Sequence, residues 1–345
     1  MAVGLRRRRR RAKVARVALA LGVLVLVAVG VRLAQGYAGR AAFDRRIAAL
    51  EQSADPERAL KAQMVFDFAG RTYLISVPVD LDRVERERTL DTSVVFESTG
   101  TDRERYLRTV VDELSHSRLI GRLTDEFRLI KLEQRLDSDQ YLELLARAVQ
   151  QIPYGDVRRD FRLPSEVLIA RTAVCSEKTV LLAALLQHEG YDTAVWVLDS
   201  GGHAAVGVAC SGQGYRGSGY AFVETTIVSF VGQVDPRYSA RSHVATPPQL
   251  VRIAEGKTYR ADGEVDVILS ILDAASRQRR TLAPYVRYAS TGGSLHATRY
   301  AERAHQYENA DSLSAYILGN MSDRARVYRE LTQSARDLIL EGAAG

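Results

Sequence analysis

The strongest hydrophobic pattern in the chain is a run of seven apolar residues, Val180–Leu186, within the segment CSEKTVLLAALLQHEG that begins at Cys175. Glu177 and Lys178 favour the first turn of a helix, and Gly190 is a typical C-terminal stop. A helix that is apolar on every side is usually buried in a core. The pattern therefore predicts a buried helix with Cys175 at its N-terminus.

Three segments rich in β-branched and aromatic residues follow this helix. They are separated by glycine-rich turns and comprise Tyr191–Leu198, Ala204–Cys210 and Tyr220–Thr226. This composition predicts strands, and the short turns between them predict an antiparallel meander. The fold class that follows is α+β, with the apolar helix packed on an antiparallel sheet.

The segments before this core carry weaker but distinct patterns. Residues 65–80 alternate about a glycine as a β-hairpin does. Residues 101–136 are highly charged, with apolar residues spaced as in a surface helix. Asp137 and Ser138 then offer caps for a helix that runs to about Gln151. After Pro247-Pro248 the spacing of apolar residues predicts mostly amphipathic helices.

Three residues in this core have the chemistry of a cysteine nucleophile and its partners. A thiol at a helix N-terminus has a lowered pKa, and Cys175 is predicted to lie there. His203 in GGHAAVGV and Glu224 in YAFVETT follow in the chain. A carboxylate among aromatic residues needs a partner, and an imidazole held by it keeps one nitrogen for the thiol. We therefore predict Cys175 as nucleophile, His203 as base and Glu224 as the residue that orients it.

The other histidines and the second cysteine are predicted to stand outside this site. His188 is on the same helix as Cys175 but about 19 Å away. Cys210 is seven residues from His203, so the two should face opposite sides of the strand, and we expect an apolar packing role and no disulfide with Cys175. The remaining histidines lie in polar stretches and are predicted at the surface: His116, His243, His296 and His305. No metal or phosphate motif is present, so we expect no cofactor or catalytic metal.

The segment from Gln151 to Thr226 resembles the catalytic core of the transglutaminase-like superfamily, in IPYGD, TAVCSEKTVLLAALLQHEGY, GGHAAVGV and VETT. The resemblance covers roughly a quarter of the chain. It implies a papain-like α+β fold in which the Cys begins a central helix and the His and the acid lie on adjacent antiparallel strands. Ala173 stands where many members have Gly, and Glu224 where Asp is commoner, so the longer acid must be set back to reach the imidazole. The motif does not identify the side chain of the oxyanion hole.

The resemblance implies a reaction at an amide or ester carbonyl through a thioester on Cys175. Water as acceptor makes a peptidase or amidase, and an amine makes a protein-glutamine acyltransferase. The absence of a visible calcium-site pattern in the sequence favours the hydrolase. A noncatalytic membrane scaffold or binding protein on the same fold is the alternative, although a scaffold has no need of a thiol, an imidazole and a carboxylate at these positions.

The N-terminus predicts where this chemistry takes place. Six arginines, at residues 6–11, are joined by Lys13 and Arg16, and residues 17–31 carry no charge. Apolar flanking residues extend this run toward membrane-spanning length. The basic cluster should remain cytoplasmic, which predicts a single-pass cell-membrane protein with its catalytic domain outside the cytoplasm. A signal peptide cleaved at residues 36–38 is the alternative, and it exports the same domain.

The charge of the chain is concentrated in this segment. Eight of the 48 basic residues lie in the first sixteen positions, and the rest of the chain carries 40 basic residues against 42 acidic ones. No basic patch indicates nucleic acid as a partner. We expect a peptide or protein amide substrate, while the sequence does not indicate an oligomeric state.

These patterns together predict the organisation of the chain. In order, it comprises a basic cytoplasmic tail (1–13), a transmembrane anchor (14–36), a helical stalk (37–62), a small β-rich segment (63–100), a transglutaminase-like catalytic domain (101–250) and a mostly helical C-terminal extension (251–345).

Overall fold

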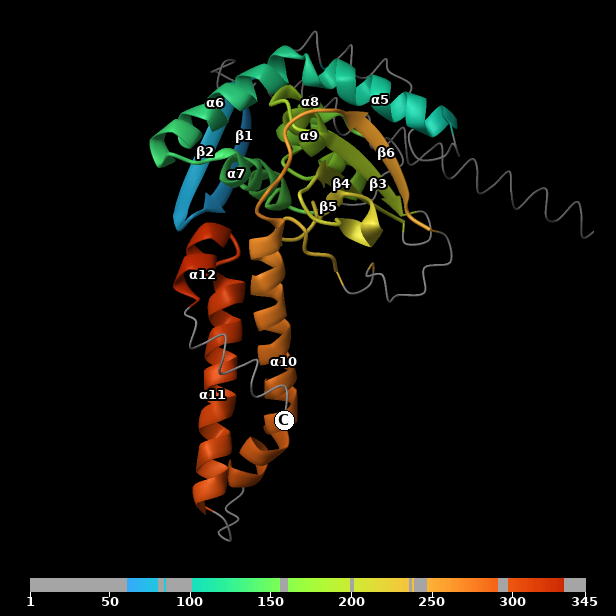
Figure 1. Ribbon diagram of the computed structural model, residues 1–345. Coiled ribbons are helices and arrows are strands. Elements are labelled where there is room, and N and C mark those ends of the chain that lie inside the picture. The colour runs from blue at the N-terminus through green and yellow to red at the C-terminus, as the bar shows by residue number, and fades with distance from the viewer. Residues whose placement is uncertain are drawn as a thin grey trace, which may run out of the picture. The chain divides into compact units, whose positions relative to one another are not determined.

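The computed structural model describes residues 61–79, 84, 101–155, 161–198, 202–235, 238, 247–290 and 297–331. The fold of this part is α+β, with eight α-helices and two antiparallel sheets (Figure 1). All of these elements belong to one unit of the chain, formed by residues 61–155 and 162–345. The predicted tail and anchor, and the stalk as far as residue 60, lie outside the described residues. Among the helices that are described, none combines the length and the apolarity needed to cross a bilayer.

The first sheet is the β-hairpin that the alternating pattern predicted. Strands β1 (Lys61–Phe68) and β2 (Arg71–Pro78) pair antiparallel across Ala69 and Gly70. Both turn residues have positive φ, 49° and 76°, as a two-residue turn between twisted strands requires. The alternating burial already begins at Ala62, so the start of β1 falls in the segment that the sequence interpretation assigned to a helical stalk.

Three helices connect this hairpin to the core. They are α5 (Thr101–Ser115), α6 (Arg118–Gln134) and α7 (Ser138–Gln150). The charged helical segment is therefore interrupted, because the Ser117 hydroxyl caps a new helix through the N–H of Ile120. Asp137 caps α7 as predicted: its carboxylate accepts from the N–H of Gln140, whose side chain accepts from the N–H of Asp137.

The second sheet forms the core, with four antiparallel strands in the order β5-β4-β3-β6. The strands are β3 (Thr193–Leu198), β4 (His203–Ala209), β5 (Tyr220–Val223) and β6 (Gln249–Ala254). The first three are the predicted meander, each within two or three residues of its expected limits. β6 was not predicted; it pairs with β3 and spans the predicted domain boundary between residues 250 and 251.

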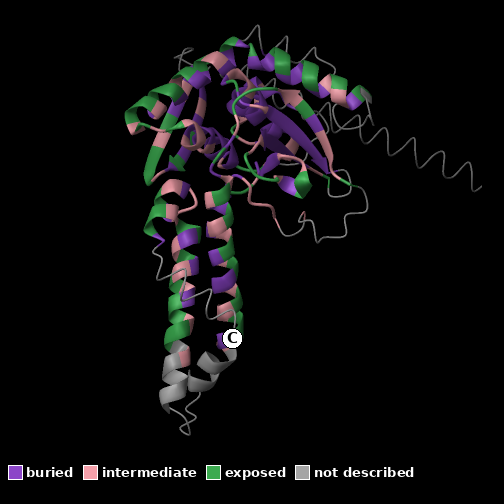
Figure 2. Cartoon of the chain, in the orientation of Figure 1, coloured by how far each residue is buried: buried purple, intermediate pink, exposed green. Residues whose placement is uncertain are grey.

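The two faces of this sheet are covered differently. Helix α9 (Cys175–His188) packs on β3 and β4, and its residues 177–186 are all buried. The short helix α8 (Pro164–Ala170) leads into it and was not predicted. A second set of buried side chains forms a separate apolar cluster: Ala194, Trp196, Leu198, Ala205, Tyr215, Tyr220 and Phe222. Figure 2 accordingly colours most of β3 and β4 as buried.

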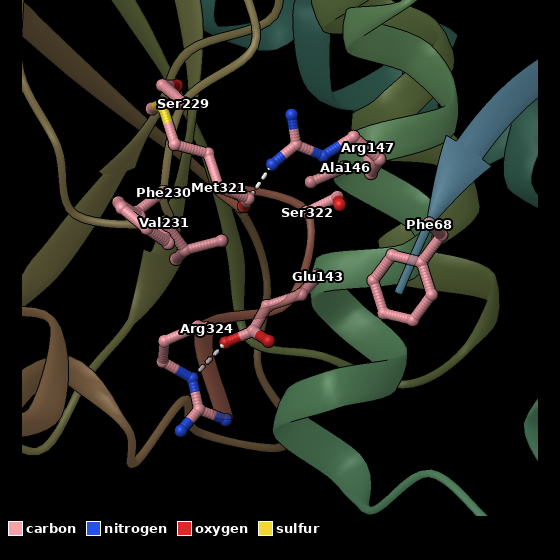
Figure 3. A pocket seen from close by; sticks show the side chains of 10 residues that line it. All are labelled: Phe68, Glu143, Ala146, Arg147, Ser229, Phe230, Val231, Met321, Ser322 and Arg324. Carbon is pink, nitrogen blue, oxygen red and sulfur yellow. Dashed lines mark hydrogen bonds and ion pairs between the residues drawn. The ribbon is translucent and has the colours of Figure 1, made fainter. Parts of the chain in front are cut away.

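The C-terminal region is helical, as the sequence predicted. α10 (Asp262–Ser290) and α11 (Ala297–Gly319) pack side by side, and α12 (Arg324–Glu330) follows. The start of α12 and the connection before it contact α7 (Figure 3). Arg324, the first residue of α12, forms an ion pair of 2.6 Å with Glu143, and Arg147 donates to the carbonyl of Met321 in the connection. Burial raises the pKa of Glu143 to about 7, although Arg324 and the Tyr259 hydroxyl oppose the shift.

Candidate active site

Helix α9 begins at Cys175, the position that the sequence predicted. Val174 before it is extended, with φ −93° and ψ 172°, and donates its N–H to Glu177 at 3.0 Å. The carboxylate of Glu177 therefore closes the first turn of the helix. The free N–H groups of this turn and the helix dipole favour a thiolate at Cys175.

A buried ion pair fixes the same turn from the other side. Arg162 binds Glu177 with two parallel hydrogen bonds, Nε to Oε1 at 2.9 Å and Nη2 to Oε2 at 2.7 Å. The side chains are 8% and 3% exposed, and the N–H of Arg162 also donates to Oε1. A bidentate pair fixes orientation as well as distance. The sequence interpretation took Glu177 only as a residue that favours the helix.

The structure brings His203 and Glu224 into direct contact. Nε2 of His203 lies 3.0 Å from Oε2 of Glu224, and both side chains are buried. His203 is the first residue of β4, and Glu224 directly follows β5. The strand ends there because Oε1 of Glu224 accepts from the N–H groups of Thr225 and Thr226 and from the Thr226 hydroxyl. The prediction of a strand to Thr226 was wrong for this reason.

Cys175 lies beside the other nitrogen of this imidazole. Its sulfur is 3.9 Å from the carbonyl oxygen of Gly202, the neighbour of His203 in the chain. Glu224 occupies Nε2, so Nδ1 is the ring nitrogen that remains for the hydrogen bond with the thiol. The ring of Tyr238 stacks on the imidazole with centroids 4.8 Å apart. The ring is thus held by contacts at its edge and on its face.

The pKa values favour a charged Cys–His pair. Burial lowers the pKa of His203, but its hydrogen bonds to Cys175 and Glu224 outweigh burial and raise the pKa to about 9. Burial raises the pKa of Cys175, yet the hydrogen bond and positive charge of His203 bring the pKa below its ordinary value. For Glu224, burial is again opposed by His203, with a lowered pKa as the result. Both shifts favour a thiolate next to an imidazolium over the neutral pair.

Tyr154 is a neighbour of the thiol that the sequence interpretation did not single out. Its segment forms a bridge with Ala173, through hydrogen bonds from Gly155 N to Ala173 O at 3.1 Å and from Ala173 N to Pro153 O at 3.0 Å. The Tyr154 hydroxyl lies close enough to the thiol and to the backbone N–H of Cys175 to interact with both groups. Burial and the negative charge of Cys175 raise the pKa of Tyr154. The side chain is 53% exposed, so it borders solvent beside the nucleophile.

Two further buried residues, Gln150 and Lys178, hold the segment that carries Glu224. The side chain of Gln150 donates to the carbonyl oxygens of Glu224 and Ser229, at 2.9 and 3.2 Å. The ammonium of Lys178 donates to the carbonyl oxygen of Gln150 at 3.2 Å and is completely buried. The sequence marks Lys178 only as a residue that favours the first turn of the helix, because its role depends on the contact with α7.

The remaining histidines and Cys210 lie away from this arrangement. His188, on the last turn of α9, donates from Nδ1 to the carbonyl of Ser115 at 2.6 Å. His116 and His305 are exposed, and His243 and His296 lie outside the described residues. Both cysteines are free, and burial raises the pKa of Cys210. The described ranges contain no group of three or more His, Cys, Asp or Glu arranged to hold a metal ion.

The arrangement combines three groups that acyl transfer requires. Cys175 places a thiol at a helix N-terminus, His203 places an imidazole beside it, and Glu224 adds a buried carboxylate that fixes the ring. No family model, curated protein or solved structure matches the chain.

Proposed function

We propose that the protein is a cysteine hydrolase or acyltransferase of the transglutaminase-like type, acting on amide bonds through a thioester. One observation carries the proposal: His203 lies between Cys175 and Glu224, with Nε2 bound to the carboxylate at 3.0 Å and Nδ1 left for the thiol. A merely structural histidine has no need of a thiol beside the nitrogen that its carboxylate leaves free. The resemblance to the transglutaminase-like superfamily, with the papain-like fold that it implies, belongs to the same proposal.

In the first half of the reaction the thiolate of Cys175 attacks the carbonyl carbon of the substrate. The new C–S bond places negative charge on the carbonyl oxygen. As the C–N bond breaks, the imidazolium of His203 gives its proton to the departing amine. Glu224 remains ionised throughout, since its role is to hold the ring and offset the positive charge.

The second half regenerates the enzyme. His203, now neutral, takes a proton from the acceptor while the acceptor oxygen or nitrogen attacks the thioester carbon. The C–S bond then breaks, and the thiolate and imidazolium are restored. With water the product is a carboxylic acid, and with an amine it is a new amide. We favour water, because the sequence has no visible calcium-site pattern of the kind associated with crosslinking enzymes.

The developing oxyanion needs donors that are already in position. The backbone N–H of Cys175 is one, and the Tyr154 hydroxyl, which contacts this N–H and the thiol, is the second that we propose. Tyr154 exchanges its contact with the N–H of Cys175 for the substrate oxygen when substrate binds. Its exposure on the solvent side of the thiol fits this role.

The compartment is part of the proposal. The arginine cluster at residues 6–11 and the uncharged run at 17–31 support an anchor with its N-terminus in the cytoplasm and the enzyme outside. The substrate is then a peptide or protein amide in that compartment.

A thioester trap tests the function. Full-length protein in detergent is incubated with a peptide-based acylating probe, and the mass gain is mapped to a residue. We expect a hydroxylamine-sensitive adduct on Cys175 in the wild type and in Cys210→Ala, and none in Cys175→Ala. Labelling that is equal in Cys175→Ala would refute the function and favour a noncatalytic scaffold on the same fold.

A further inference from the structure

Lys178 is a charged residue of the site that the acyl-transfer steps do not use. It lies one turn after Cys175 on α9, so both side chains leave the helix on nearly the same side. Its side chain has no exposure to solvent. An ammonium in such a position loses its hydration and persists only where other groups compensate for the loss.

The direct contact of the ammonium is a backbone carbonyl. Nζ donates to the carbonyl oxygen of Gln150 at 3.2 Å, at the last residue of α7. The side chain of the same residue holds the carbonyls of Glu224 and Ser229, and so fixes the loop that carries the catalytic acid. Gln150 therefore connects the two residues: its carbonyl oxygen accepts from Lys178, and its side chain donates to the carbonyl oxygen of Glu224.

The negative charges that act on Lys178 are those of the catalytic groups. Burial lowers its pKa to about 8, while Glu224 and the thiolate of Cys175 oppose this shift. The other charged groups around the site are already paired: His203 with Glu224, and Glu177, on the same turn of α9, with Arg162. The charge of Lys178 has no carboxylate of its own in the ion pairs of the described residues.

The charges of the site balance only when this lysine is included. In the reactive state Cys175 and Glu224 are negative and His203 is positive, which leaves one negative charge in a buried site. Lys178 supplies the positive charge that cancels it. A buried site with no net charge keeps its ions at lower cost than one with an uncompensated charge.

We propose that Lys178 is a positioning residue of the active site, whose ammonium on the carbonyl of Gln150 is the counter-charge that keeps Cys175 ionised beside Glu224. The inference rests on the proposed function, because it assigns a role to Lys178 in the same reactive thiolate. A buried lysine can contribute to the reactivity of the thiol or to the stability of the fold. Loss of the charge should reduce the reactivity of the thiol without reducing the stability of the fold.

The substitution Lys178→Met tests this separation. Methionine has a similar shape and no charge, so burying it is expected to leave the melting temperature unchanged or higher. The pH dependence of alkylation of Cys175 by iodoacetamide is then measured by peptide mass spectrometry on the full-length protein. We expect the apparent pKa of Cys175 to rise by about one unit, since one opposite charge nearby is removed. The alkylation rate at pH 7 should fall by up to about tenfold.

Lys257→Met is the matched control. Lys257 also donates to a backbone carbonyl, that of Glu189 at 2.7 Å, but at the opposite end of α9, about 21 Å along the helix. The same loss of charge there should leave the alkylation profile of Cys175 unchanged. Lys178→Gln is the second test variant, because its amide can still donate to Gln150 while carrying no charge. It should behave as Lys178→Met does.

The outcomes separate this inference from the proposed function. If Cys175 of the wild type titrates near its unperturbed value, the proposed function fails. If the wild type titrates low and both variants at position 178 match it, the counter-charge role of Lys178 is wrong and the function stands. A normal profile for Lys178→Gln with a shifted one for Lys178→Met would assign the effect to the hydrogen bond. Unfolding of both variants would make Lys178 a requirement of the fold and overturn the proposal.

Discussion

The ion pair between Arg162 and Glu177 gives the sharpest stability prediction of the structure. Arg162→Met removes a guanidinium that makes two hydrogen bonds of 2.9 and 2.7 Å to a carboxylate that is 3% exposed. Removing one member of a buried pair usually costs 3–5 kcal/mol, and we expect about 3, since the N–H of Val174 still binds Glu177. For a unit of this size the melting temperature should fall by about 6–12 °C. Turnover in the proposed reaction should fall too, because the same carboxylate fixes the start of the helix that carries Cys175.

Two further variants make this prediction decisive in urea unfolding. Arg71→Met breaks an ion pair of 3.0 Å whose side chains are 58% and 63% exposed, and should cost no more than about 0.5 kcal/mol. The double variant Arg162→Met with Glu177→Met leaves no unpaired charge, although the N–H groups of Arg162 and Val174 lose their acceptor. It should therefore recover part of the lost stability without recovering activity. A loss in Arg162→Met no larger than that in Arg71→Met, or a double variant no more stable than the single one, would refute the stabilising role of the buried ion pair.

Four other predictions concern the residues of the site. Glu224→Gln should lower kcat by about 10- to 100-fold, because a glutamine cannot accept both from His203 and from the N–H groups that Oε1 binds. Activity measures the lost contact with His203, and hydrogen exchange at Thr225 measures the lost contact with the backbone. A wild-type kcat would make the carboxylate dispensable. Tyr154→Phe should lower kcat by about 100-fold with little change in KM, as expected for a group that binds the oxyanion, and a change in KM alone would reassign it to substrate binding. The profile of kcat/KM against pH should fall on the alkaline side with an apparent pKa near 9, where His203 loses its proton. The stability that protonated His203 contributes is complete below about pH 6.5 and is lost as the pH rises through 9, because its folded pKa lies above the unfolded one. Thermal melts of the wild type and of His203→Ala over this range should converge at high pH, and melts that stay parallel would contradict the assignment.

The sequence predicted elements whose signals are local. The helix that begins at Cys175 follows from a continuous apolar run, the cap at Asp137 from a residue type that binds its own helix, and the β-hairpin from alternation over eight residues. The strand β6 has no such signal, because it is short, follows two prolines and has Val251 as its only fully buried residue. Its pairing with β3 is a contact between distant segments.

In the candidate site, too, some residues have a local sequence signal and others depend on contacts between distant segments. Cys175, His203 and Glu224 could be selected by residue type, order and the elements around them, and the structure brings the three side chains together. Tyr154 and Lys178 were not selected, because their roles depend on tertiary contacts: an isolated bridge to Ala173, just before α9, in one case, and the end of α7 in the other. A tyrosine in a loop and a lysine in the first turn of a helix look ordinary in a sequence.

The proposed function requires a reactive thiolate at Cys175, and the second cysteine of the same chain provides an internal reference. Iodoacetamide alkylation of the full-length protein is followed from pH 5 to pH 10, with both cysteines quantified by peptide mass spectrometry. The pKa of Cys175 is lowered by His203, whereas burial raises that of Cys210. Cys175 should therefore react with an apparent pKa below the ordinary value of about 8.5 and faster than Cys210 throughout. Equal rates for the two thiols, with both titrating near 8.5, would contradict the account.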